Sequence, residues 1–455
     1  MASYCNILWF AFLFFAQSLC AQSFNAVPNH DFSEGEEGAL PKGWTQVSDR
    51  PAIAPHFSKE SENGRSYLLM KGTGNPAAVG YIKAKTDIVP GKTYEFKVLF
   101  DKTANLNPQR NLLFQCKGSG NHDGIMDFYK LDNGLTEGRT KVFFPENSNS
   151  EVELRLYYRL LSQGAAKIFD VSLTATEPDA PRWVRVACTS GNFGPAEAVS
   201  VIEQAAADQA DLVLLPEYLN YSNGAETLDG TTCTMLAEMA LKHKIFIAAG
   251  IIRHDENSGN KFNTGVLYDR AGKLVGTYDK IHPYSPEVND QGFTPGNKVQ
   301  VFDTELGKIA FMICYDSWFT DVAELAALRG AELILFPNAG YYKSLMHARA
   351  ADNRVRIAIS SLYHPFGIFD TVGRDVQNPE KDSTTGVGGH TFDNVKVLKV
   401  GNIEVLVASL DLNCSPSPHY NGGTMMEAPG GRRNRDEQIY YLEDDIKREK
   451  ERWWK

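Results

Sequence analysis

The spacing of apolar residues changes at residues 177–181, a short proline-containing segment, and this change constrains the fold more than any other feature of the chain. Before it, runs such as KTYEFKVLF and VELRLYYRL alternate apolar and polar residues, which is the period of a half-buried strand. After it, apolar runs such as DLVLLP and IFIAAGII are separated by segments with helical periodicity. The 455 residues therefore predict two domains, an all-β domain followed by an α/β domain.

The all-β domain is expected over residues 22–176, where turn-forming residues separate short strands in the manner of an antiparallel sandwich. NHDFSEGEEGALPKGWT near its start and AKIFDVSLT at its end resemble the first and last strands of jelly-roll carbohydrate-binding modules of secreted glycan-active enzymes. This resemblance implies a glycan partner, which would bind exposed aromatic faces. The aromatic candidates, for each of which a place in the core is the alternative, are Trp44, Tyr81, Phe128 and Tyr129.

The first residues of the chain, 1–21, have the pattern of a cleaved signal peptide. The apolar run ILWFAFLFFA is too short to span a bilayer, and small and polar residues follow it. No Lys or Arg precedes the run, and a membrane anchor is the alternative interpretation. A signal peptide predicts a secreted or periplasmic protein.

Charge and cysteine content exclude several partners and cofactors. A formal net charge of -10 argues against a nucleic acid or an anionic membrane, because phosphate binding needs clustered Lys and Arg, and favours a small molecule or a glycan. No CxxC motif or His pair suggests zinc, and no metal or cofactor is expected. After signal cleavage an odd number of cysteines remains, so at least one thiol is free or intermolecular. These cysteines are Cys116, Cys188, Cys233, Cys314 and Cys414.

Three reactive residue types follow predicted strands of the α/β domain, which is expected over residues 182–413. Glu217 follows LVLLP, Lys280 follows KLVGTYD, and Cys314 follows KIAFMI and precedes a predicted helix. Functional groups gather at strand ends in α/β folds, and backbone N–H groups in a strand-to-helix turn can bind a developing anion. For Cys314 the alternative is a buried structural thiol.

A thiol, a carboxylate and an ammonium suffice for covalent amide cleavage. Glu217 can remove the thiol proton of Cys314, which then attacks an amide carbonyl. The Lys280 ammonium and the backbone N–H of Tyr315 fit the role of oxyanion donors. The same acid can protonate the departing amine and later activate water against the thioester.

The motifs LLPEY, YDKIHP and ICYDSWF, in this order, resemble the Glu-Lys-Cys triad of the nitrilase, or carbon–nitrogen hydrolase, superfamily. The resemblance implies an αββα sandwich with two central sheets. It also implies a role for Glu287, in HPYSPEVNDQGFTPG, which matches a second glutamate of the family that holds the lysine and orients substrate. A solvated loop carboxylate is the alternative for Glu287.

The residues after the cysteine bear on the substrate. Tyr315 and Asp316 stand where nitrile hydrolysers of the family carry Trp-Glu, which favours amides over nitriles. SWFTDVAE also departs from the Arg and Phe-Pro-Glu of many amidase-like members, which puts an arginine-bound substrate carboxylate in doubt. The family geometry would give a pocket lined by Tyr218, Asn220, Tyr221, Tyr315, Trp318, Asn338 and Tyr341.

Residues 414–455 form a predicted C-terminal arm whose second half, DEQIYYLEDDIKREKERWWK, is highly charged and has helical periodicity. Its apolar stripe consists of Ile439, Leu442 and Ile446. Arms of this family often cross to a neighbouring subunit, which predicts a homodimer; a solvated, fraying helix is the alternative.

The sequence as a whole predicts an exported amidase that cleaves a non-peptide amide or carbamoyl C–N bond through a Cys314 thioester and releases an amine or ammonia. Two alternatives stay open. An acyltransferase would use the same triad and pass the acyl group to an amine. A glycan-binding protein would carry a catalytically silent hydrolase domain.

Overall fold

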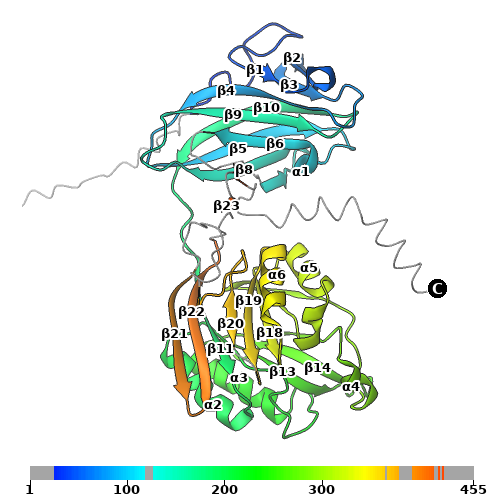
Figure 1. Ribbon diagram of the computed structural model, residues 1–455, viewed down its shortest axis with the longest axis vertical. Coiled ribbons are helices and arrows are strands. Elements are labelled where there is room, and N and C mark those ends of the chain that lie inside the picture. The colour runs from blue at the N-terminus through cyan, green and yellow to red at the C-terminus, as the bar shows by residue number, and fades with distance from the viewer. Residues whose placement is uncertain are drawn as a thin grey trace, which may run out of the picture.

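The computed structural model describes residues 25–117, 127–363, 366–378, 392–413, 419–420 and 423–424. The predicted signal peptide and all but four residues of the predicted C-terminal arm lie outside this part of the chain. Figure 1 shows the strands β1–β10 in one body and β11–β22 in another. Among the described residues, no helix is long and apolar enough to cross a lipid bilayer.

The N-terminal body consists of two antiparallel sheets, with strand orders β1-β4-β9-β6 and β2-β3-β10-β5-β8-β7. Alternate residues of β9, from Val152 to Tyr158, are buried and belong to a core that draws side chains from both sheets. The elements are β1 (Thr45–Val47), η1 (Pro51–Ile53), β2 (His56–Glu62), β3 (Arg65–Lys71), β4 (Val79–Asp87), β5 (Thr93–Lys102), α1 (Pro108–Asn111), β6 (Leu112–Lys117), β7 (Asp127–Lys130), β8 (Thr136–Phe143), β9 (Glu151–Arg159) and β10 (Ala165–Thr176).

One of the four aromatic candidates for glycan binding, Trp44, is a core residue, so its prediction as a sugar contact is wrong. Trp44 is only 3% exposed, and Phe128 packs against the core with its ring 5.8 Å from that of Phe100. Tyr81 and Tyr129 remain at least partly exposed. The alternation of apolar and polar residues in the sequence does not reveal that Trp44 packs into this core.

The C-terminal body alternates strands and helices, which confirms the α/β class. Its elements are β11 (Trp183–Ser190), α2 (Pro195–Ala207), β12 (Leu212–Leu214), α3 (Thr231–His243), β13 (Phe246–His254), β14 (Lys261–Tyr268), β15 (Leu274–Asp279), α4 (Ser285–Asn289), β16 (Val301–Thr304), β17 (Gly307–Phe311), η2 (Cys314–Trp318), α5 (Asp321–Leu328), β18 (Leu333–Asn338), α6 (Lys343–Asn353), β19 (Arg356–Ser361), β20 (Gly367–Phe369), β21 (Phe392–Val400) and β22 (Ile403–Asp411). Two short strands, β23 (His419–Tyr420) and β24 (Gly423–Thr424), pair with each other.

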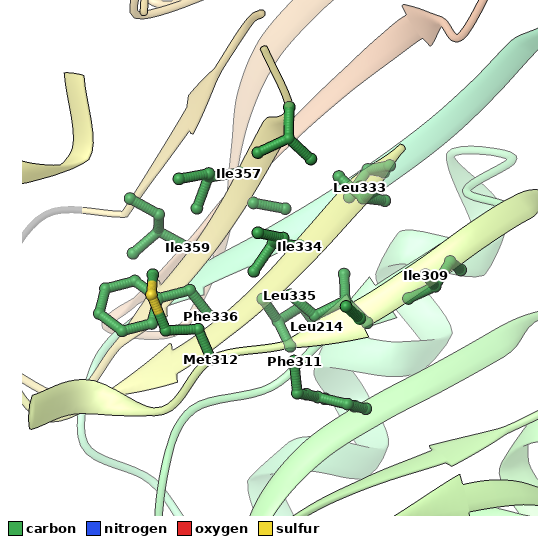
Figure 2. Packing of buried hydrophobic residues seen from close by; sticks show 14 of the residues in the cluster. Leu214, Ile309, Phe311, Met312, Leu333, Ile334, Leu335, Phe336, Ile357 and Ile359 are labelled. Atoms are coloured by element: carbon green, nitrogen blue, oxygen red, sulfur yellow. The ribbon is translucent and has the colours of Figure 1, made fainter. Parts of the chain in front are cut away.

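Hydrogen bonds join the strands of this body into one sheet of twelve, where the family resemblance predicts two central sheets. The link between its two halves is narrow, because β11 pairs with β19 only at Ser190 and Ser361. Leu214 of one half shares a core with Leu335 of the other, and Figure 2 shows side chains of this core. The halves therefore pack face to face although a ladder connects them.

Helices cover the outer faces of the two halves. Val213, which points away from the shared core, packs in a second cluster with Val201 of α2 and Leu236 of α3. On the other half, Ala323 of α5 and Met346 of α6 pack in the same cluster as the strands of that half. Strands such as β18 are buried along their whole length, as expected for strands covered on both faces. Polar side chains just beyond these strands are consequently held in a rigid setting.

Candidate active site

Glu217 lies beyond the end of β12, where the chain continues alongside β13. The Gly250 N–H donates to the Pro216 carbonyl oxygen at 3.0 Å, and a Cβ atom on Gly250 would come within 2.8 Å of the Glu217 Cα. Glycine at this position lets the backbone of Glu217 approach the neighbouring strand. The Glu217 side chain is only 1% exposed, so a carboxylate is held inside the body at the end of a strand.

Lys280 lies between two carboxylates. Its backbone N–H donates to the Asn263 carbonyl oxygen at 2.8 Å, and its Nζ donates to Glu217 Oε1 at 3.1 Å and to Glu287 Oε2 at 2.8 Å. Burial alone would lower the pKa of the ammonium, but Glu217, Cys314 and Glu287 outweigh burial and raise its pKa above the ordinary value. The site therefore holds a permanent positive charge.

Glu287, in the short helix α4, is 5% exposed, which excludes the alternative of a solvated loop carboxylate. Its Oε2 accepts the Tyr284 backbone N–H at 2.5 Å, and its Oε1 accepts the Tyr218 hydroxyl. Burial raises the pKa of this carboxyl. The charge and the hydrogen bond of Lys280 lower the same pKa by more than burial raises it, so that the pKa lies below the ordinary value. Glu287 is therefore ionised beside the lysine.

Asn263, on β14, is a member of this cluster that the sequence interpretation missed. Its Nδ2 donates to Glu217 Oε1 at 2.6 Å and to Glu287 Oε1 at 2.9 Å. One amide thus fixes the relative position of two like charges. A polar residue inside the strand run KFNTGVLY was the only available signal, and the run by itself does not show which face the residue occupies.

Cys314 begins η2, directly after the segment that leaves β17. Its φ of 41° places a non-glycine residue in the left-handed region, a strained conformation found often at functional sites. The side chain is partly exposed, and Sγ lies 3.9 Å from the Gly340 carbonyl oxygen. The turn thus places the thiol beside the carbonyl oxygen of Gly340.

Asp316 holds this turn and was not predicted to do so. It is fully buried, and its Oδ2 accepts the Ile313 N–H at 2.9 Å and the Tyr278 hydroxyl at 2.8 Å. Its Oδ1 accepts the His282 N–H at 2.8 Å. Because Lys280 lies two residues before His282, the same carboxylate connects the cysteine turn to the lysine segment.

The charges around Cys314 oppose each other. Burial raises the pKa of its thiol to about 12, the Glu217 carboxylate acts in the same direction, and Lys280 lowers it in part. The resting thiol is therefore neutral and needs a base in order to react. Glu217 Oε2 is buried and has no hydrogen-bond partner among the described residues, which leaves it available as a proton acceptor.

The other described cysteines differ from Cys314. Cys116, Cys188 and Cys233 are free but buried in the two bodies, and burial raises the pKa of Cys188 to about 12 without a carboxylate partner. Among the residues the structure describes, then, Cys314 is the thiol that combines partial exposure with a neighbouring carboxylate and ammonium. This combination is the arrangement that a nucleophile needs.

The predicted substrate contacts separate into two groups. Tyr218 bonds to Glu287, and the Tyr315 ring lies 6.0 Å from that of Trp318, which is 49% exposed. These three residues lie at or next to the buried cluster.

The remaining predicted contacts bond to or pack against other parts of the body, or face solvent. Asn338 is fully buried, and its amide donates to the Ser360 carbonyl oxygen at 3.0 Å, so it ties β18 to β19, and its role as a substrate contact stays a prediction. Asn220 is also buried and bonds to the Ile252 backbone. Tyr221 is 75% exposed and faces solvent. Tyr341 packs its ring 6.2 Å from a core phenylalanine.

No group of three or more His, Cys, Asp or Glu side chains placed to hold a metal ion occurs in the described part of the chain. Two cavities, of about 540 and 420 Å³, lie away from Cys314, the first beside Arg185 and the second beside Arg270. The side chains of the cluster supply a thiol, two carboxylates and an ammonium.

The α/β fold thus holds a carboxylate, an ammonium and a thiol together at its strand ends, a set of groups that can support covalent cleavage of a carbonyl compound. Residues 192–358 match the family model described as carbon-nitrogen hydrolase. Omega-amidase NIT2 of Mus musculus is 31% identical over 185 residues, which cover 36% of this chain and 67% of that protein. Nitrilase homolog 2 of Dictyostelium discoideum is 32% identical over 199 residues, covering 39% of this chain and 61% of that protein.

Among solved structures, Nit3 of Saccharomyces cerevisiae, described as a member of branch 10 of the nitrilase superfamily, is similar with a TM-score of 0.42 and 24% identity, over 52% of this chain and 93% of that chain. The chain belongs to the carbon-nitrogen hydrolase family, within the nitrilase superfamily. It is therefore an enzyme that hydrolyses carbon–nitrogen bonds other than peptide bonds.

Proposed function

We propose that this enzyme cleaves a non-peptide amide or carbamoyl bond through a thioester on Cys314. The observation that carries the proposal is the single buried cluster in which Lys280 bonds to both Glu217 and Glu287 next to the partly exposed thiol. An amide substrate also agrees with the activity of the mouse relative, an omega-amidase.

Thioester formation begins with proton transfer from the Cys314 thiol to the free Oε2 of Glu217. Because the pKa of the thiol is raised, the proton must leave as Sγ attacks the carbonyl carbon, and the carboxylate acts as a general base. The carbonyl oxygen becomes an oxyanion, for which the Lys280 ammonium supplies the nearest fixed positive charge. The protonated Glu217 then returns the proton to the departing nitrogen, which leaves as an amine or ammonia.

Thioester hydrolysis uses the same groups, with water as the nucleophile and the sulfur of Cys314 as the leaving group. Glu217, again a carboxylate, takes a proton from water, and the resulting hydroxide attacks the thioester carbonyl while Lys280 stabilises the second oxyanion. The C–S bond breaks, the sulfur regains the proton from Glu217, and a carboxylic acid is released. Glu287 keeps Lys280 in place through both steps, since its Oε2 lies 2.8 Å from Nζ.

Intact-protein mass spectrometry tests this proposal. The full-length protein and its Glu217→Gln and Cys314→Ala variants are exposed to a pool of small amides, carbamoyl compounds and amino-sugar amides. We expect an acyl mass gain that peptide mapping places on Cys314 and that the alanine variant lacks. Release of ammonia or amine by the Cys314→Ala variant, or an acyl adduct on a residue other than Cys314, would contradict the thioester.

The acceptor of the acyl group separates hydrolysis from transfer. With an added primary amine such as hydroxylamine, an acyltransferase would give the hydroxamate as its main product, whereas a hydrolase gives mainly the free acid. We expect the acid, because the Glu217 that activates the thiol is also placed to activate water. A catalytically silent protein would give neither product, and the complete cluster argues against that alternative.

We further propose that the N-terminal body binds a glycan on the outer face of its four-stranded sheet. Tyr81 and Tyr157 are directly opposed on β4 and β9, their rings lie 4.4 Å apart, and the Arg155 guanidinium lies 5.0 Å from the Tyr81 ring. Partly exposed rings beside a polar group are suited to the face of a sugar. A polysaccharide panel with the full-length protein and a Tyr81→Ala variant tests the assignment, and absence of binding to every polysaccharide would overturn it.

Export and a homodimer complete the proposal. The predicted signal peptide, residues 1–21, supports action outside the cytoplasm, and N-terminal sequencing of the mature protein tests for cleavage after Ala21. The predicted apolar stripe in the C-terminal arm supports a dimer. Light scattering of the full chain and of a chain ending at residue 413 tests whether the arm holds two copies together.

A further inference from the structure

Five aromatic side chains form one continuous cluster that starts next to the nucleophile. The Tyr315 ring lies 5.4 Å from that of Tyr284, 6.0 Å from Trp318 and 5.6 Å from Phe319, and the Trp318 ring lies 5.0 Å from Tyr342. These centroid distances are those of favourable aromatic contacts. We call this set of five residues the mouth cluster.

The chain segments that carry these rings also hold the reacting groups. Tyr315 directly follows the nucleophile. The backbone N–H of Tyr284 donates to Glu287 Oε2, and Tyr342 comes two residues after Gly340, whose carbonyl oxygen lies 3.9 Å from the cysteine Sγ. The mouth cluster is therefore fixed to the reacting groups from three separate parts of the sequence.

The rings of the mouth cluster are unusually exposed. Tyr342 is 60% exposed, Tyr284 52%, Trp318 49% and Phe319 39%. Large side chains of this kind are normally buried, and several exposed ones in contact with each other mark a binding surface. Because the surface adjoins the nucleophile, its nearest occupant is the part of the substrate that does not react.

Basic side chains beside the mouth cluster are already engaged. His282 stacks on Phe319 with a centroid distance of 4.0 Å, and its Nε2 lies 3.0 Å from Asp321. Lys343, in the first turn of α6, lies 2.8 Å from Asp375. Of the described residues around the rings, these two basic side chains thus face carboxylates of the protein, and the surface offers ring faces to a substrate.

We propose that the mouth cluster binds the non-reacting part of the substrate by stacking, so that the preferred amide carries an uncharged ring with an apolar face, either an aryl group or a pyranose. This inference rests on the proposed function for the site of cleavage. Trp318 has the largest ring system of the cluster and is half exposed, so it provides the largest stacking area.

Binding to a full-length Cys314→Ala variant, which cannot form a thioester, tests the inference independently of turnover. The ligands for calorimetry are 3-phenylpropionamide, a glucopyranosyl amide, butyramide and succinamate. We expect at least one ring-bearing amide to bind about tenfold more tightly than butyramide, and an added Trp318→Ala change to remove this preference, while Trp318→Phe retains most of it. Equal affinities, or tightest binding of succinamate, would overturn the inference.

Turnover of the same compounds by the enzyme with Cys314 intact provides the second readout. Trp318→Ala is expected to lower the ratio of kcat/KM for the ring-bearing amide to kcat/KM for butyramide about tenfold. Trp183→Ala is the matched control, since Trp183 is 45% exposed and lies at the start of β11. An equal loss for every amide, accompanied by a change in oligomeric mass, would show that the rings contact a second copy and would refute the substrate role. If no amide is turned over, the proposed function fails, and the binding comparison still decides the role of the mouth cluster.

Discussion

The charge balance around Glu217 and Glu287 depends on a neutral side chain, Asn263. Its Nδ2 donates one hydrogen to each carboxylate, so its loss leaves both with one donor fewer in a buried site. Hydrogen bonds to charged groups contribute about 1.5–3 kcal/mol each. We predict that Asn263→Leu lowers kcat by a factor of about 10 to 100, with a smaller change in KM, because the amide orients the base and does not touch the substrate.

The control for this substitution is Asn111→Leu. Asn111 is likewise buried and bonds the Arg159 and Leu160 carbonyl oxygens, but it lies in the N-terminal body. Both variants should lower the melting temperature, and only Asn263→Leu should lower kcat and shift the pH–rate profile. If Asn263→Leu keeps the wild-type pH–rate profile and both variants lose activity equally, Asn263 contributes to stability and does not orient the base.

The raised pKa of Cys314 predicts that Glu217→Gln speeds alkylation of the thiol and abolishes amide turnover. Burial and the Glu217 carboxylate both raise this pKa, whereas Lys280 lowers it, so Glu217→Gln removes a cause of the increase and the pKa falls. More thiolate is then present at pH 8, and each unit of pKa decrease raises the thiolate fraction about tenfold. We expect iodoacetamide to alkylate Cys314 about tenfold faster in Glu217→Gln, while amide turnover is lost with the base. Slower alkylation in this variant would show that the carboxylate favours the thiolate.

Residue identities at strand ends were readable from the sequence, and the partners inside the site were not. Glu217 and Lys280 each follow an apolar run, Glu287 was predicted from the family resemblance, and all three lie in one hydrogen-bonded cluster beside Cys314. Asn263 lies within a strand, where its contribution depends on which face of the strand it occupies. Asn338, a polar residue at a strand end, bonds the neighbouring strand, and its position at the strand end did not reveal this partner.

At the level of elements, the turn η2 depends on Asp316. Both carboxylate oxygens accept hydrogen bonds, from the Ile313 and His282 N–H groups and from the Tyr278 hydroxyl. An amide in this position would direct its own N–H hydrogens at one of these donors. Asp316→Asn should therefore destabilise the fold by about 1–3 kcal/mol and lower kcat, because the left-handed Cys314 loses its support.

Thermal unfolding and kinetics of Asp316→Asn, measured at one pH, check this prediction. Asp321→Asn is the comparison, because Asp321 starts α5 on the surface and pairs with His282. The surface change should cost little, as exposed pairs contribute about 0–1 kcal/mol. Equal kcat in wild type and Asp316→Asn would mean that the turn keeps its shape without the carboxylate.

The pattern of strands and helices was predictable, and the pairing of strands was less so. Apolar runs such as DLVLLP correctly indicate buried strands, although β12 itself spans only Leu212–Leu214. The contact at Ser190 and Ser361 joins the two halves of the sheet across a long stretch of sequence. Periodicity describes which face of one strand is buried, and it contains no information about a register between distant strands.

At the scale of the whole molecule, the two bodies have separate cores. The cluster of the N-terminal body contains residues from Val27 to Leu173, whereas the two clusters of the C-terminal body begin at Val184 and Ala187. Each body therefore has the apolar interior that independent folding requires. The segment between β10 and β11 contains two prolines and is exposed along most of its length, which is typical of a linker.

Separate cores predict separable functions. A chain that starts at residue 182 should keep the kcat of the full-length enzyme on small soluble amides, because the described contacts of Glu217, Lys280 and Cys314 all lie within the C-terminal body. If the N-terminal body serves to hold the enzyme on a glycan, the truncated chain should instead lose activity toward amides attached to an insoluble polysaccharide. Comparison of both chains on a soluble amide and on the same amide coupled to polysaccharide beads measures the difference, with Tyr81→Ala in the full chain as the matched point variant. A truncated chain that is inactive on the soluble amide but folded by circular dichroism would show that the N-terminal body contributes to the active site itself.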